Sequence, residues 1–212
     1  MSSSIGFVTG LTAEARLARK LGMAEAGGGL PAGAEAAAER LVAQGATALV
    51  SFGLAGGLDP ALIPGAVVVP AEVMEGGQRY RTNYALCARF GGQAPVRALA
   101  AQAILATPEQ KVQAYHATYS VIVDLESGAV ARVAARHGLP FAAVWAVCDP
   151  AGFALPPLAL EALDAGGRIG AWRVLRSVLR RPGQIPALVA LSGHAAEARA
   201  ALARLTSNAR GP

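Results

Sequence analysis

The chain has 212 residues, enough for one medium-sized domain with a hydrophobic core, and we treat residues 1–212 as a single domain. No apolar run approaches the roughly 20 residues that a membrane-spanning helix needs, and the first residues lack the pattern of a signal peptide. The only two cysteines, Cys87 and Cys148, are too few to stabilise a domain of this size through disulfide bonds. We therefore expect a cytoplasmic protein with reduced thiols.

The net charge of +5 comes entirely from residues 151–212, because residues 1–150 carry equal numbers of basic and acidic side chains. A basic C-terminal third favours an acidic neighbour such as anionic lipid or nucleic acid, or it is simply a solvated, arginine-rich face. Nucleic acid is the weakest of these readings, since aromatic residues are not interleaved with the basic ones.

In the first half of the chain, short apolar runs predict buried strands at residues 5–9, 47–52 and 66–69. Helical patterns cover residues 14–21, with Thr12 as the expected N-cap, and residues 33–44. The glycine-rich residues 53–60 predict a turn, and residues 74–95 predict a loop or an active-site lid.

In the second half, we expect strands at residues 103–106, 119–124 and 140–148. Helices are expected at residues 108–116, 127–137 with Gly138 at the C-cap, 158–165, 170–180 and 186–205. The alternation predicts an α/β fold with helices covering a central sheet, and ligands bind such sheets beyond the strand ends. The places to look are therefore residues 53–59, 124–127 and Asp149.

Three segments, taken together, carry a resemblance to a known family. Residues 124–126 read DLE before a predicted helix, and the buried strand that follows ends in Cys148 and Asp149. Residues 52–58 read FGLAGGL, and residues 5–14 form the opening strand and the helix that carries Glu14. This arrangement resembles the nucleoside phosphorylase and nucleosidase superfamily. It implies a three-layer α/β/α fold with a central mixed sheet, shortened, with extra C-terminal helices over residues 156–212.

Within that superfamily, the chain is most similar to the hopanoid-associated phosphorylases. The shared features are Asp59-Pro60, Glu126-Ser127, Asp149-Pro-Ala151 and the stretches that begin at Leu155 and Arg180. The implied substrate is adenosylhopane, a triterpenoid attached to adenosine, from which adenine would leave.

Cleavage of an N-glycosidic bond develops positive charge on the ribose, and the purine leaves as an anion unless an acid protonates it. The resemblance makes Asp149 that acid, placed near purine N7. Its alternative role is a helix N-cap, with Pro150 at the first helical position.

The resemblance places Glu126 on the ribose hydroxyls, where an ionised carboxylate accepts two hydrogen bonds. The alternative is an acidic residue in the first turn of a helix, favoured by the helix dipole. Leu125 stands where the family has Met, a swap that changes little volume. Asp124 is expected to support the site rather than contact the ligand.

The resemblance places Glu14 beside the attacking oxygen, and its alternative is an ordinary solvated helix residue. Gly53, Gly56 and Gly57 would let the backbone approach the ligand, which is compatible with a tight turn between strands. The three histidines (His116, His137 and His194) lack metal-ligand spacing, so no metal and no cofactor are expected. Cys148 is expected to be a small core residue rather than a nucleophile.

Two departures from the family pattern concern the nucleophile. Leu54 stands where the family has a serine that contacts phosphate or water, and Trp145 stands at the position of an arginine that partners Glu14. Phosphorolysis requires donors for inorganic phosphate. The candidate donors are Arg40, Arg79 and Arg81, so phosphorolysis and hydrolysis both stay open.

Trp172, Leu175, Val178 and Leu179 share a helical face beside three arginines, which predicts either peripheral membrane contact through residues 172–180 or a packed terminal helix with a basic outer face. Three functions remain open: cleavage of adenosylhopane, cleavage of a soluble adenosine derivative such as methylthioadenosine, and a non-catalytic nucleoside or lipid carrier. Members of the superfamily commonly assemble as homodimers or larger oligomers.

Overall fold

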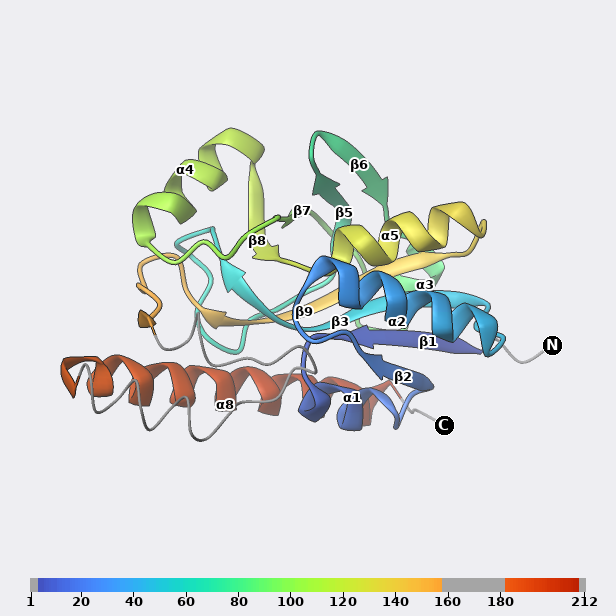
Figure 1. The fold of residues 1–212 in the computed structure, drawn as a ribbon, viewed down its shortest axis with the longest axis horizontal. Coiled ribbons are helices and arrows are strands. Elements are labelled where there is room, and N and C mark those ends of the chain that lie inside the picture. The colour runs from blue at the N-terminus through green and yellow to red at the C-terminus, as the bar shows by residue number, and fades with distance from the viewer. Residues whose placement is uncertain (1–3, 158–181, 210–212) are drawn as a thin grey trace.

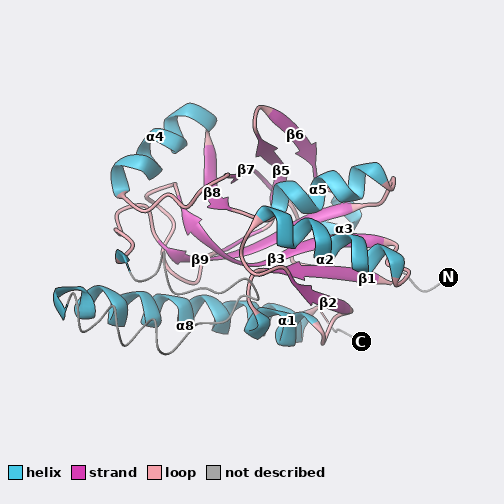
Figure 2. Ribbon diagram, in the orientation of Figure 1, coloured by secondary structure: helices cyan, strands magenta, loops and turns pink. Residues whose placement is uncertain are grey.

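The computed structural model describes residues 4–157 and 182–209, and these form a mixed sheet with helices on both faces (Figures 1 and 2). The expectations for residues 158–165 and 170–180, including the amphipathic segment, lie outside the described residues. The strands run in the order β2-β1-β3-β8-β7-β5-β6, and β9 pairs with β3 and with β4. This confirms the predicted α/β fold with a mixed central sheet.

The centre of the sheet consists of three parallel strands, β1 (Ile5–Thr9), β3 (Ala48–Gly57) and β9 (Phe141–Asp149). Their side chains are buried almost throughout, as expected for strands that are covered on both faces. Since the three strands run in the same direction, their carboxyl ends meet at one edge, and β8 (Ser120–Asp124) pairs antiparallel with the end of β3 at that edge.

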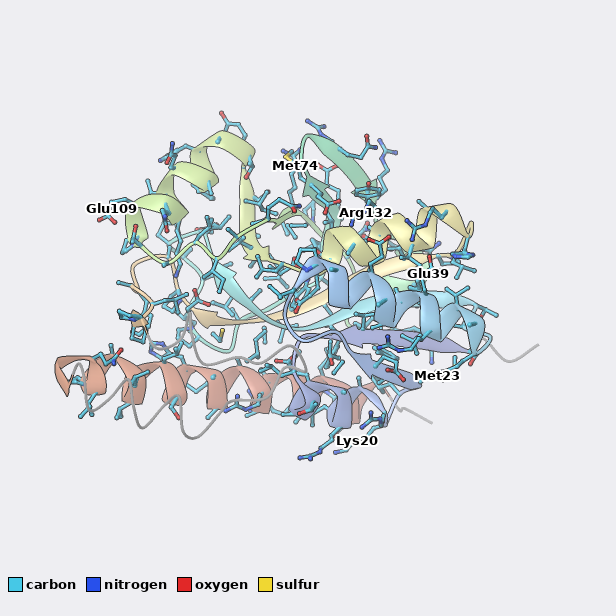
Figure 3. All side chains as sticks on the ribbon, in the orientation of Figure 1. Lys20, Met23, Glu39, Met74, Glu109 and Arg132 are labelled. Carbon is cyan, nitrogen blue, oxygen red and sulfur yellow. The ribbon has the colours of Figure 1, made fainter. Side chains whose placement is uncertain are left out.

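Helices α2 (Pro31–Ala43) and α5 (Ser127–Arg136) cover one face of the sheet, whereas α1 (Thr12–Ala18) and α8 (Ile185–Asn208) cover the other (Figure 1). Ion pairs join α2 to α5: Arg136 contacts Glu35 at 2.8 Å and Glu39 at 2.7 Å, and Arg132 contacts Glu35 at 3.2 Å. Figure 3 labels Glu39 on α2 and Arg132 on α5. Such partly exposed pairs contribute little stability, so the apolar helix faces hold this layer to the sheet.

The remaining elements are β2 (Met23–Ala26), β4 (Val67–Val68), β5 (Pro70–Glu75), β6 (Gln78–Arg81), α3 (Tyr84–Ala88), β7 (Ala94–Ala100), α4 (Pro108–Thr118) and a short 3-10 turn (Pro182–Gln184). Helix α4 begins where its cap predicts, since the Thr107 side chain accepts a hydrogen bond from the backbone N–H of Gln110 and Pro108 follows. Gly138 ends α5 with a φ of 64°, as expected of a C-terminal glycine.

Several local predictions are wrong. Residues 53–57 continue β3 instead of turning, because the strand keeps its pairing with β9 as far as Gly56 and Asp149. Residues 74–95 contain the β5–β6 hairpin and α3 rather than a lid, and residues 103–106 are a loop after β7. Leu11, not Thr12, occupies the N-cap of α1, and strand β2 was missed because residues 23–26 form a short edge strand with little apolar pattern.

Candidate active site

A cavity of about 540 Å³ opens at the edge where the carboxyl ends of β3, β8 and β9 meet. Four carboxylates line it: Glu14, Asp124, Glu126 and Asp149. Most of the remaining wall is apolar, and three segments contribute much of it: the end of β3 (Leu54 to Gly56), the loop after β7 (Ala103 to Leu105) and one face of α8 (Leu188, Leu191, Ser192, Ala195 and Arg199). Acidic groups that converge in an apolar cavity are typical of an active site.

Glu14 lies in the first turn of α1 with a side chain that is only 2% exposed. Its Oε2 accepts a hydrogen bond from the Leu11 backbone N–H at 3.1 Å. Burial raises the pKa of Glu14 to about 7, although the Leu11 N–H and the charge of Arg199 act in the opposite direction. Glu14 is therefore a buried acid that changes ionisation near neutral pH, and not a solvated helix residue.

Trp145 explains part of the burial of Glu14. It lies in the middle of β9, pairs with Gly53 of β3, and is 1% exposed. A Cβ atom on Gly53 would lie 2.6 Å from Glu14 Oε2 and 3.3 Å from the Trp145 ring. The indole and the carboxylate thus both lie against Gly53, which places an apolar ring beside the acid.

Asp124 is the last residue of β8 and Glu126 follows it two residues later, but the two carboxylates have different hydrogen-bond partners. Asp124 Oδ1 accepts the backbone N–H groups of Glu126 at 2.7 Å and of Ser127 at 2.6 Å, and the Ser127 hydroxyl donates to its other oxygen. Burial raises the pKa of Asp124 to about 6, with these hydrogen bonds limiting the rise. Asp124 therefore fixes the start of α5 and the backbone of Glu126.

The Glu126 side chain is 5% exposed and does not cap α5. Its Oε1 would lie 2.5 Å from a Cβ atom on Gly10, so it packs against the end of β1. Burial, together with the nearby charges of Asp124 and Glu14, raises the pKa of Glu126 well above its usual value. A carboxyl group in this setting requires donors from a ligand to become ionised.

Asp149 ends β9 and is 7% exposed. Its Oδ2 forms an ion pair of 2.8 Å with Lys111 Nζ, and Cys148 Sγ donates to its Oδ1 at 3.3 Å. Residues 150–156 form a turn and an irregular segment, so the alternative role of Asp149 as a helix N-cap is wrong. Cys148 is partly buried and packs against the core cluster that includes Phe52 and Val144, and it also lines the cavity beside this acid.

Glycines bring the backbone up against three of the four carboxylates. A Cβ atom would lie 2.5 Å from Glu126 at Gly10, 2.6 Å from Glu14 at Gly53 and 3.0 Å from Asp149 at Gly56. Of the predicted glycines, Gly56 lines the cavity and Gly53 lies beneath Glu14, whereas Gly57 faces Val147 and Pro150 instead. The glycine-rich end of β3 thus accommodates two acids by leaving out side chains.

Residues 7–106 match the model of the Phosphorylase superfamily. That range includes Glu14 and the glycine-rich strand but ends before Glu126 and Asp149. The comparison with curated proteins gave no match.

Solved structures similar to the chain show its fold. A Streptococcus pyogenes S-adenosylhomocysteine nucleosidase in complex with 5-methylthiotubericidin is 21% identical, with a TM-score of 0.63 over 72% of this chain and 86% of that chain. A mutant of the Helicobacter pylori 5'-methylthioadenosine/S-adenosylhomocysteine nucleosidase (MTAN), with 5'-methylthioadenosine in the active site, is 13% identical. Its TM-score is 0.65 over 72% of this chain and 87% of that chain. Futalosine hydrolase of the same organism is 14% identical, with a TM-score of 0.65 over 71% of this chain and 86% of that chain. The chain therefore has the fold of the nucleosidases.

The predicted phosphate donors do not reach the four carboxylates. Arg40 pairs with Glu25 on the outer side of α2, and Arg79 and Arg81 lie on β6, where they line a second cavity of about 450 Å³. Among the described residues, Arg199 of α8 is the only cation that lines the carboxylate cavity. The sequence does not single out Arg199, because nothing in its local sequence distinguishes it from the other arginines of the C-terminal region.

The histidines lie outside the carboxylate cavity. His137 contacts Glu39 at 2.9 Å, and the ring of His194 packs on Phe153 with a centroid distance of 5.2 Å. The described residues contain no group of three histidine, cysteine or acidic side chains that would hold a metal ion. In the described part of the chain, no helix is long and apolar enough to cross a membrane.

Proposed function

We propose that this protein cleaves the N-glycosidic bond of an adenosine-type nucleoside and releases adenine. The observation that carries the proposal is the convergence of Glu14, Glu126 and Asp149, from α1, the end of β8 and β9, on one cavity. The reaction needs groups at the purine, the ribose and the nucleophile, and the site offers one carboxyl for each. The nucleosidase fold of the chain supports the same reaction class.

Asp149 is the proposed general acid at the purine. Its proton passes to N7, the C1′–N9 bond breaks, and the bond's electron pair stays with the leaving adenine. Glu126 is the proposed ligand of the ribose hydroxyls, whose O–H groups would supply the donors that no described residue gives its buried carboxylate. Leu125, Leu54 and Gly56 line the surrounding wall.

Glu14 is the proposed activator of the nucleophile. With a pKa of about 7 it is partly ionised at neutral pH, so it can accept a proton from water as the water attacks C1′. The apolar Leu54 and the single lining cation Arg199, among the described residues, also favour water over phosphate. Inorganic phosphate remains the second candidate, with Arg199 as its donor.

The apolar wall supports a substrate with an apolar substituent. Five aliphatic side chains face the cavity from the loop after β7, from the segment after β9 and from α8: Ile104, Leu105, Leu155, Leu188 and Leu191. We therefore propose adenosylhopane as the substrate, with ribosyl- or phosphoribosyl-hopane as the second product, in hopanoid biosynthesis. A soluble substrate of the methylthioadenosine or S-adenosylhomocysteine type is the alternative, supported by the similar structures. The third candidate function is that of a non-catalytic carrier of a nucleoside or a lipid.

Adenine release distinguishes these alternatives. The protein is incubated with adenosylhopane in detergent, with methylthioadenosine and with S-adenosylhomocysteine, each with and without inorganic phosphate. We expect release of adenine that does not require phosphate and is fastest with adenosylhopane. Faster release from a soluble nucleoside would replace the substrate assignment, and a requirement for phosphate would replace water as the nucleophile. Tight binding without release from any of them would leave the carrier function.

The same proposal includes the assembly and the location of the protein. We propose a cytoplasmic homodimer or larger homo-oligomer that contacts the membrane peripherally through residues 172–180. Flotation with vesicles that contain anionic lipid tests the membrane contact, and an absence of binding would refute it. Sedimentation of the purified protein tests the oligomer.

A further inference from the structure

Lys111 is a charged side chain with no exposed surface, and the roles proposed above do not use it. It lies in the first turn of α4, beyond the end of β9 in space, although 38 residues separate it from Asp149 in the chain. Its ammonium group contacts Asp149 Oδ2 at 2.8 Å and three backbone carbonyl oxygens, those of Asp149 at 3.1 Å, Pro150 at 3.0 Å and Phe153 at 3.0 Å.

These contacts saturate the ammonium group. It has three N–H donors and four oxygen atoms within hydrogen-bond distance, one of them on a carboxylate. A buried ammonium is strongly unfavourable unless an opposite charge and hydrogen bonds compensate it, so Asp149 and Lys111 depend on each other. The same contacts hold the turn that follows β9, which carries the backbone of Asp149.

The arrangement leaves the two oxygens of Asp149 in different settings. Oδ2 is held by the lysine, which does not line the cavity, whereas the one donor to Oδ1 among the described residues is the weak donor Cys148 Sγ. The carboxyl group is therefore fixed in orientation, with Oδ1 as the oxygen that remains for a ligand in the cavity.

We propose that Lys111 is a positioning residue for the general acid: it anchors Asp149 through Oδ2 and the following turn, so that Oδ1 faces the purine. This inference rests on the proposed function. The proton that Asp149 donates comes from solvent as the nucleoside binds, because in the free protein the carboxylate is the ion-pair partner of Lys111. When that O–H bond breaks and an N–H bond forms on the purine, the negative charge returns to the carboxylate. The ammonium beside Oδ2 is placed to stabilise that charge, and it keeps its own three protons throughout.

The test compares Lys111→Met with Lys20→Met, a substitution of the same type at the exposed lysine after α1 (Figure 3). We expect Lys111→Met to lower kcat for the adenosine substrate by about 100-fold with a small change in KM, because the loss falls on proton transfer. Lys20→Met is expected to retain activity within two-fold.

Two further readouts separate positioning from a structural role. An N7-methylated adenosine substrate needs no proton on its leaving group, so Lys111→Met is expected to lose less than ten-fold with it. In a double-mutant cycle, Lys111→Met is expected to add less than three-fold to the loss caused by Asp149→Asn. Equal losses on both substrates, or fully additive losses in the cycle, would overturn the inference.

Wild-type activity separates this inference from the function on which it rests. If the wild-type protein releases no adenine from any nucleoside, the proposed function fails; if it does and Lys111→Met matches it, only the role of Lys111 fails. Circular dichroism checks the fold of each variant. If Lys111→Met does not fold, Lys111→Gln, which keeps amide donors for the carbonyls without the charge, takes its place with the same expected outcomes.

Discussion

Asp149 and Glu14 line the same cavity, but their charges are compensated in different ways. Asp149 forms a 2.8 Å ion pair with Lys111, a fully buried lysine that also binds three carbonyl oxygens. Glu14 has no ion pair of that kind among the described residues: it accepts the Leu11 backbone N–H at 3.1 Å, and the charge of Arg199 acts on it, with the Trp145 ring nearby over Gly53.

The difference separates two tasks within one cavity. A carboxyl group with a fixed partner keeps one orientation, which suits proton donation to a purine held in one place. A carboxyl group whose pKa burial raises to about 7 exchanges its proton near neutral pH, which suits activation of water. The following predictions test whether these two carboxyls divide the reaction in this way.

The largest loss of activity is expected for substitution of Asp149, the carboxyl group that Lys111 holds in one orientation. Asp149→Asn keeps the shape of the side chain and removes the acid, so adenine release is expected to fall by about 1000-fold. The matched control is Asp59→Asn, a half-buried residue of the turn after β3 that does not line the cavity and whose side chain accepts the Ala61 N–H. Activity within ten-fold of wild type in Asp149→Asn would remove Asp149 from the mechanism.

Glu126 lies near Glu14, since both carboxylates approach Gly10, and its substitution should affect binding of the sugar. We expect Glu126→Gln to lower kcat/KM by about 100-fold, because it loses a charged acceptor for the ribose hydroxyls. The variant is also expected to discriminate less between adenosine and 2′-deoxyadenosine. The control is Glu109→Gln, which alters an exposed glutamate on α4 (Figure 3). Unchanged discrimination against the deoxy substrate would contradict the assignment.

Glu14 should reduce stability when it is ionised. Its folded-state pKa of about 7 lies above the usual 4.5, so the folded protein binds the proton more tightly, and stability falls as pH rises from about 4.5 to 7. Glu14→Gln removes this penalty and is expected to increase the free energy of unfolding at pH 8 by about 1–2 kcal/mol, with little difference at pH 4. Urea denaturation at both pH values measures it; an equal effect at both would show that ionisation is not the cause.

The smallest expected effect is a shift in the pH profile. If ionised Glu14 activates water, kcat/KM rises about ten-fold per pH unit below 7 and levels off above it. Because the charge of Arg199 lowers the pKa of Glu14, Arg199→Met is expected to move this limb to higher pH. A limb that stays in place in Arg199→Met, or that persists in Glu14→Gln, would assign it to another group.

The sequence by itself determined the strands at 5–9, 119–124 and 140–148 to within one or two residues, and the placement of acids directly after two of them. These features are local, since a buried strand of a covered sheet is a continuous apolar run and a polar residue ends it. The glycine-rich segment was read as a turn for the same local reason. Only pairing with β8 and β9 shows that it continues a strand.

The tertiary structure alone decided which side chains accompany the acids. Lys111 and Arg199 look like ordinary helix residues in the sequence, and they reach the cavity region because α4 and α8 pack beside the strand ends. Arg79 and Arg81, which the sequence offered as anion donors, lie on a hairpin at another cavity. The charge and the raised pKa of a buried group depend on neighbours that are distant in sequence, and local patterns do not carry that information.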